Sequence, residues 1–170
     1  MTQATDFRIV QATPADVPLI LQLIRDLASY EKLSDEVVAT EALLHRALFG
    51  DGPRVEAIIA QADGEPAGFA LFFHNFSTFL AKPGIYLEDL FVRPAFRGRG
   101  LGKVLLAHLA HLAGERGCGR LEWAVLDWNQ PAIDFYRSLG AKAVPQWMLN
   151  RLSGDALAAL ARTAVAANEP

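Results

Sequence analysis

The chain has 170 residues, of which 52% are hydrophobic and 21% are charged, and its formal net charge is −3 at pH 7. This length fits one domain over residues 1–170, which buries about two thirds of the surface that the unfolded chain exposes. The absence of a Lys/Arg block argues against a nucleic-acid partner, and no apolar run reaches the roughly 18 residues of a membrane span. The lone cysteine, Cys118, excludes an intrachain disulfide and favours a reducing compartment, so we expect a cytoplasmic protein.

The first half of the chain shows helix start and stop signals. Thr13-Pro14-Ala15-Asp16 is typical of a helix start, and the apolar spacing that follows predicts a helix to about Ala28. Thr40 is placed to cap a second helix, which ends at Gly50. Strands are predicted over 7–12, 55–62 and 67–76.

The second half alternates strands and helices. A strand over 85–92, a helix from Leu101 to about Arg116 and a strand over 121–126 form a βαβ unit with parallel strands. Asn129 can cap a helix over 131–139, and Ser153 a last helix. Two final strands are predicted over 141–144 and 146–152.

Arg97-Gly98-Arg99-Gly100-Leu101-Gly102 lies between a predicted strand and a predicted helix. The first amides of a helix have no intrahelical partner and attract anions, and glycines let a phosphate approach the backbone closely. Arg97, Arg99 and Lys103 add mobile positive charge beside this turn. The segment is therefore a candidate diphosphate site, although a glycine-rich turn whose basic residues only face water has the same composition.

Two acidic residues, Glu88 and Asp89, interrupt an otherwise apolar predicted strand. Adjacent residues of a regular strand point to opposite faces, so a single carboxylate would face a given cleft unless a bulge brings both to it. Two such acids are candidates for binding or deprotonating an amine. An ion pair with a Lys or Arg at the strand end is the alternative.

Tyr136 lies on the predicted helix after Asn129, with Ile133 and Leu139 on the same face. Its phenol, which has a pKa of about 10, can act as a general acid toward a developing thiolate, whose own pKa in the free state is about 8.5 for a cysteine-like thiol. A core tyrosine bonded to a backbone carbonyl is the alternative. A nucleophilic role for Cys118 would need a nearby His/Asp pattern, which the sequence lacks. A metal site at His108 and His111 would need a third ligand, which is not evident, so no metal is expected.

Four segments together resemble the GNAT family of N-acetyltransferases, and within it the spermidine/spermine and thialysine acetyltransferase group. The resemblance spans roughly residues 7–161. It implies an α/β fold with a mixed, mostly antiparallel central sheet of six to seven strands flanked by helices. The segments are Tyr30-Glu31, Tyr86-Leu87-Glu88-Asp89, Arg97 to Gly102, and Trp128-Asn129-Gln130-Pro131-Ala132-Ile133-Asp134-Phe135-Tyr136.

The resemblance implies transfer of an acetyl group from acetyl-CoA to a primary amine in a ternary complex. Tyr136 would be the general acid, and Glu88 would assist amine deprotonation through water. The amine site would comprise Tyr30, Glu31, Glu88 and Asp89. The cofactor would contact Leu90, Phe91, Val92, Arg97, Gly98, Arg99, Gly100, Leu101, Gly102, Lys103, Asn129 and Ala132.

One departure from the resemblance concerns the substrate. The polyamine enzymes of the group carry a further acid on the third strand, whereas the matching stretch His74-Asn75-Phe76-Ser77 has none. A diamine or a lysine-like amino acid is then as plausible as a long polyamine. A peptide or protein N-acetyltransferase and a non-catalytic acyl-CoA-binding module remain alternatives, and the resemblance implies a homodimer.

Overall fold

The computed structural model describes residues 6–164, which form two compact units, one ending at Ala124 and the other beginning at Val125. The first unit is built on a five-stranded sheet with the strand order β1-β2-β3-β4-β5. The first four strands are antiparallel, and β5 is parallel to β4, as the predicted βαβ unit requires. The strands are β1 (Phe7–Gln11), β2 (Glu56–Ala62), β3 (Glu65–Ser77), β4 (Lys82–Val92) and β5 (Leu121–Trp123).

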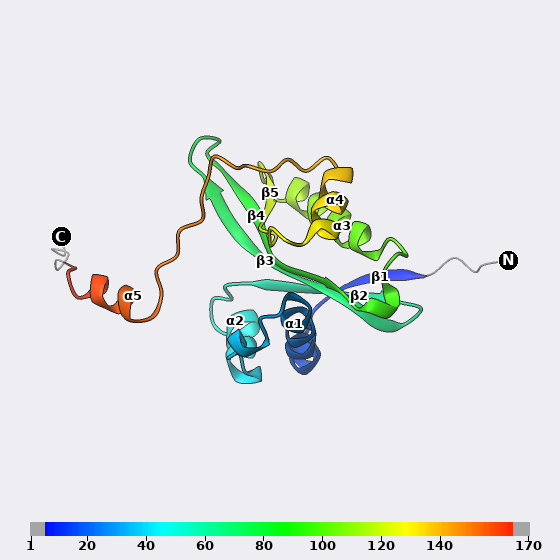
Figure 1. Ribbon diagram of the computed structural model, residues 1–170. Helices are drawn as coiled ribbons and strands as arrows, with labels where there is room; N and C mark the ends of the chain where they lie inside the picture. The colour runs from blue at the N-terminus through cyan, green and yellow to red at the C-terminus, as the bar shows by residue number, and fades with distance from the viewer. Residues whose placement is uncertain (1–5, 165–170) are drawn as a thin grey trace. The chain divides into compact units, whose positions relative to one another are not determined.

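Helices α1 (Val17–Glu31) and α2 (Glu41–Phe49) cover one face of this sheet (Figure 1). Short 3-10 turns, Pro14–Asp16 and Ser34–Glu36, precede them. As predicted, the Thr40 hydroxyl accepts a hydrogen bond from the Leu43 amide at 3.3 Å. The core on this face joins Ile20 and Leu23 of α1 to the strands through Ile59, Phe69, Leu71 and Phe91.

Helix α1 is longer than the sequence predicted. The apolar spacing indicated an end near Ala28, but the helix continues to Glu31 and ends where Lys32 adopts a left-handed conformation, with φ 62°. The Leu33 amide bonds back to the Ala28 carbonyl at 2.8 Å and closes this C-terminal cap. The extra turn carries Tyr30 and Glu31 on the helix rather than on a loop.

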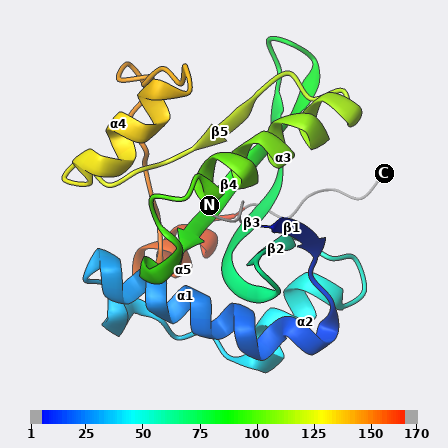
Figure 2. The same ribbon diagram turned by 90° about the vertical axis from the view of Figure 1, so that its right-hand side faces the viewer.

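Helix α3 (Leu101–Glu115) lies on the opposite face of the sheet from α1 and α2 (Figure 2). Leu101, Leu105 and Leu109 are fully buried, and their spacing places them on one face of the helix. The 3-10 turn Pro94–Phe96 and the glycine turn connect β4 to this helix. The end of β4 and the start of α3 are therefore held close together by a short connection.

The second unit contains α4 (Gln130–Ser138) and α5 (Gly154–Ala161). The strands predicted over 141–144 and 146–152 are wrong, so the sheet has five strands rather than six to seven. A strand needs a neighbouring strand for its backbone groups, and within residues 6–164 no strand pairs with this segment. Its side chains from 142 to 152 are exposed, so its apolar alternation buries no face.

Candidate active site

A β-bulge in β4 sets the positions of the two strand acids. In the pairing with β3, Asp89 lies opposite Leu71 while Leu87 lies opposite Phe72, which leaves Glu88 as the extra residue. The bulge therefore breaks the regular alternation between Leu87 and Asp89. Asp89 shares the sheet face of Leu71 and Phe91, which is the face that α1 covers. Of the two geometries that the sequence allowed for this strand, the bulge is the one that forms.

Three carboxylates meet beside the C-terminal end of α1. Burial raises the pKa of Asp89 to about 6, and the neighbouring charges of Glu88 and Glu31 act in the same direction. Burial also raises the pKa of Glu31. Among residues 6–164, none of these three acids forms an ion pair with a Lys or Arg. The group, which we call the acid cluster, is an unneutralised negative site suited to a cation.

The same strand has an open edge next to the acid cluster. Strand β3 pairs with β4 along residues 82–92, but β5 pairs only with Ile85–Leu87 on the other side. From Glu88 to Val92 the second edge of β4 has no strand partner in the described part of the unit. Backbone groups on an open edge can bind an extended ligand as an added strand would be bound. The predicted residues Leu90, Phe91 and Val92 lie on this segment.

The glycine turn between β4 and α3 has the conformation that its sequence indicated. Gly98 and Gly100 have φ values of 74° and 89°, which disfavour other residue types, and a Cβ built on either would meet no atom within 4 Å. The Val104 amide of α3 donates a hydrogen bond to the Gly100 carbonyl of the turn at 3.1 Å. Among residues 6–164, the amides of Leu101, Gly102 and Lys103 have no backbone acceptor.

The basic side chains of the turn are less mobile than the sequence suggested. The Arg97 guanidinium lies over the rings of Tyr30 and Phe91, and Arg97 Nε donates to the Val92 carbonyl at 2.9 Å. Arg99 pairs with Asp63 at 2.8 Å, and Lys103 is exposed. Asp63 tethers the turn to the β2–β3 hairpin, and sequence analysis missed it because Asp63-Gly64 signals only a turn. The turn and the open edge together fit a ligand that carries a diphosphate and an extended, amide-bearing arm.

The remaining predicted site residues belong to the second unit. Asn129 is buried and caps α4, with its Oδ1 accepting from the Ala132 amide at 3.4 Å. Tyr136 is partly buried, and its ring centroid lies 5.4 Å from that of Phe135. The cap confirms the predicted helix start and fixes Ala132 in its first turn. The catalytic role of Tyr136 stays a prediction.

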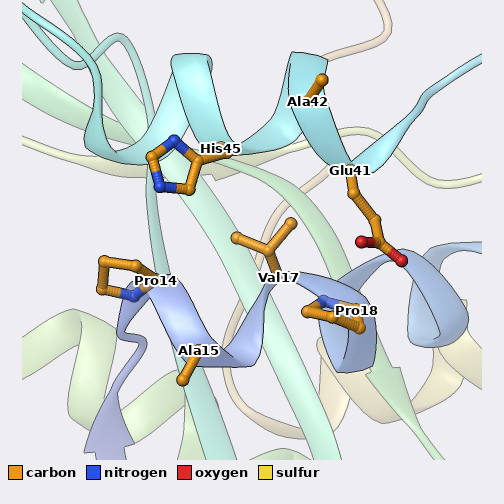
Figure 3. A pocket seen from close by; sticks show the side chains of 7 residues that line it. All are labelled: Pro14, Ala15, Val17, Pro18, Glu41, Ala42 and His45. Carbon is orange, nitrogen blue, oxygen red and sulfur yellow. The ribbon is translucent and has the colours of Figure 1, made fainter.

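Other candidate groups carry little chemistry. A cleft of about 380 Å³ between the start of α1 and α2 is lined mainly by apolar side chains, with Glu41 and His45 extending from α2 (Figure 3), and it contains none of the predicted site residues. His111 pairs with Glu115 at 3.4 Å. Within residues 6–164, no group of three or more His, Cys, Asp or Glu side chains is arranged to hold a metal ion. None of the described helices has both the length and the apolar character needed to cross a membrane.

Known proteins resemble this chain in sequence and in fold. The profile of the acetyltransferase (GNAT) family matches residues 20–141. A thialysine N-epsilon-acetyltransferase of Bos taurus is 40% identical over 90% of this chain and 96% of its own length. An L-ornithine N5-acetyltransferase of Arabidopsis thaliana is 38% identical over 90% of this chain and 87% of its own. The solved structure of an integron cassette protein from V. cholerae superposes with a TM-score of 0.78 at 28% identity, covering 92% of this chain and 98% of that one.

Proposed function

Because the chain belongs to the acetyltransferase (GNAT) family and is an acetyl-transferring enzyme, we propose that it N-acetylates a small cationic amine with acetyl-CoA as the donor. The observation that carries the proposal is the acid cluster of Glu31, Glu88 and Asp89 beside the open edge of β4. Unneutralised carboxylates of this kind attract an ammonium group. The bovine and Arabidopsis relatives are named as acetyltransferases of thialysine and L-ornithine, and both of these compounds carry a side-chain amine.

A short substrate fits the surrounding charges better than a long polyamine. At the predicted third-strand position, Asn75 donates to the Glu122 carboxylate at 2.7 Å, and that carboxylate is already paired with Arg120 at 2.8 Å. A second or third ammonium reaching this region would meet a neutralised acid. We therefore place diamines and lysine-like amino acids ahead of spermine.

The proposed cofactor contacts follow the strand and the turn. Leu90, Phe91 and Val92 would hold the pantetheine arm, and the amides from Gly98 to Lys103 would hold the diphosphate, with Arg97 and Arg99 beside them. Asn129 and Ala132 are proposed to contact the cofactor from the second unit. When bound, acetyl-CoA supplies an acetyl group activated as a thioester.

The residues of the chain would supply the proton transfers. An alkylammonium has a pKa near 10, so the amine must lose a proton before its nitrogen attacks the thioester carbonyl. Glu88 would accept that proton through a water molecule. Tyr136 would donate its phenolic proton to the departing sulfur. The carboxylates of Glu31 and Asp89 would hold the amine in position.

The proposal extends to the assembly and setting of the enzyme. The family match runs across the boundary between the two units, which supports one catalytic domain over residues 1–170. A homodimer and a cytoplasmic location complete the proposal, without a role for metal, nucleic acid or membrane.

The direct test is a substrate panel. L-Ornithine, thialysine, putrescine, spermidine and an N-terminal peptide are each incubated with acetyl-CoA, and thiol release is followed together with mass analysis of the product. We expect acetylation of the short amines. Preferred acetylation of the peptide would favour a protein N-acetyltransferase, and binding of CoA without turnover of any amine would favour the non-catalytic module.

Replacement of the proposed acid tests the mechanism. Tyr136→Phe keeps the ring and removes the proton, so kcat should fall about 100-fold or more while CoA affinity is retained. Unchanged kcat would refute the role of Tyr136 as general acid. Phe135→Leu, a change in the neighbouring ring, serves as the control for packing of α4.

A further inference from the structure

The Arg97 side chain connects three parts of the first unit. Its Cζ lies 4.7 Å from the centroid of the Tyr30 ring and 5.4 Å from that of the Phe91 ring. Its Nε donates a hydrogen bond to the Val92 carbonyl at 2.9 Å. A guanidinium this close to aromatic faces is held by cation–π attraction. One side chain thus contacts the last turn of α1 and the end of β4 while belonging to the glycine turn.

Its acceptor faces the open edge of β4. The Arg93 amide donates to the Ala67 carbonyl of β3 at 2.9 Å. In a trans peptide the carbonyl points opposite to the following amide, so the Val92 carbonyl points away from β3. Arg97 Nε therefore marks one end of the open edge, where the strand gives way to the glycine turn.

Its aromatic partner leads to the acid cluster. Tyr30 directly precedes Glu31, and both lie in the last turn of α1. The charge of Glu31 acts on Asp89 of β4, which shows that this turn and the strand acids share one electrostatic site. A shift of Tyr30 would carry Glu31 with it, because the two residues are neighbours on one rigid helix.

We propose that Arg97 is a positioning residue for the amine substrate. By stacking on Tyr30 and Phe91 it fixes the end of α1, and thereby Glu31, relative to Glu88 and Asp89. The inference rests on the proposed function. The planar guanidinium of Arg97 can stack on aromatic rings and donate a hydrogen bond at the same time, which a lysine ammonium cannot do in the same way. Occupancy of the glycine turn and amine binding become coupled through this side chain.

A charge-conserving substitution separates this role from plain attraction of phosphate. Arg97→Lys keeps the positive charge beside the turn but loses the stacked plane. We expect the KM for the amine to rise about fivefold to tenfold, while the KM for acetyl-CoA changes less than about threefold. Arg97→Ala, which also removes the charge, should raise both. Arg25→Lys, on the exposed surface of the same helix α1, is the matched control and should leave both constants unchanged.

A double-mutant cycle tests the path through Tyr30. In a Tyr30→Leu background Arg97 keeps Phe91 but has lost the stacking partner that connects it to α1, so Arg97→Lys should add little further rise in the amine KM. Thermal melting of each variant checks that folding is retained. Additive effects in the cycle, or an unchanged amine KM in Arg97→Lys with an active wild type, would overturn the inference and leave the proposed function standing. A wild type that acetylates no amine would overturn the proposed function and this inference with it.

Discussion

Two partly buried carboxyl groups of the first unit, those of Glu56 and Asp89, have pKa values that are shifted in opposite directions. Glu56, at the start of β2, binds the Arg116 guanidinium in a bidentate manner, with contacts of 2.6 and 2.8 Å. These hydrogen bonds lower its pKa. Asp89, on β4, is more deeply buried and has carboxylates rather than a guanidinium as its charged neighbours, so burial first and then these charges raise its pKa to about 6. The difference between the two acids therefore comes from burial and from their partners.

The comparison separates a structural acid, Glu56, from an acid that we propose binds the amine, Asp89. An ion pair such as Glu56–Arg116 connects β2 to the end of α3 and already satisfies both charges. The acid cluster is held together against its own repulsion, which lowers stability unless a cation arrives. That cost has a clear use in an enzyme that binds an ammonium. Substitutions of these acids test the difference between them.

The largest effect is expected for amine binding in Asp89→Asn. The amide keeps the size of the side chain but removes a charge-assisted contact with the ammonium, so the KM for the amine should rise about ten- to a hundredfold. Steady-state kinetics at pH 8 with saturating acetyl-CoA measure the change. Glu56→Gln is the matched control and should leave this KM unchanged. Equal effects of the two substitutions on this KM would show that Asp89 contributes no more to amine binding than Glu56 does.

Stability should respond with opposite signs. At pH 7.5, Glu56→Gln should lower the free energy of unfolding by about 1 kcal/mol, a value kept small because both partners are about one third exposed. Asp89→Asn should raise it by about 1 to 2 kcal/mol, because a repelled, partly buried charge disappears. Urea unfolding gives both values. A destabilised Asp89→Asn would show that the carboxylate has a stabilising partner in the folded protein.

The stabilisation by Asp89→Asn should depend on pH within one window. Below about pH 4 the aspartic acid is protonated in the folded and the unfolded chain, and the substitution changes little. Between about pH 4 and the folded pKa of about 6, the unfolded chain releases the proton and the folded chain keeps it, so rising pH lowers wild-type stability. The gap between the two proteins should therefore open over this range and stay constant above it. A gap independent of pH would contradict the raised pKa.

The smallest effect is expected for Glu31→Gln. Glu31 contributes less than burial and Glu88 to the raised pKa of Asp89, so its removal should lower that pKa slightly and raise the amine KM only about threefold. The matched control is Glu36→Gln, which changes an exposed acid on the following 3-10 turn. An effect larger than that of Asp89→Asn would make Glu31 the main amine ligand.

Local signals in the sequence are reliable where the fold depends on neighbouring residues. Thr40 and Asn129 cap their helices as predicted, because a cap joins groups only three residues apart, whereas Ser153 precedes the last helix without a side-chain cap bond in the described part of the chain. The glycine turn is recognisable for the same reason. The amino-acid sequence alone is therefore enough to locate the candidate diphosphate site.

Features that depend on distant partners could not be predicted. The sequence allowed a bulge at Glu88 but could not choose it, because it depends on the register between β3 and β4, and the Arg99–Asp63 pair joins residues 36 positions apart. The strands predicted over 141–144 and 146–152 do not form, because no neighbouring strand among the described residues pairs with this segment, despite its alternation of apolar and polar residues. Sequence analysis therefore found the chemistry of the acids but not the geometry that brings them together.

Titration of the Asp89 carboxyl with and without an amine substrate tests whether the acid cluster binds the ammonium group. Aspartate labelled with ¹³C at the carboxyl carbon, assigned by comparison with Asp89→Asn, would report its pKa by NMR in the CoA-bound protein. We predict a pKa of about 6 in the free site and a clear fall when a diamine binds, because the ammonium favours the ionised form. If the pKa of Asp89 does not change when an amine that the enzyme acetylates saturates the protein, the acid cluster does not bind the ammonium group.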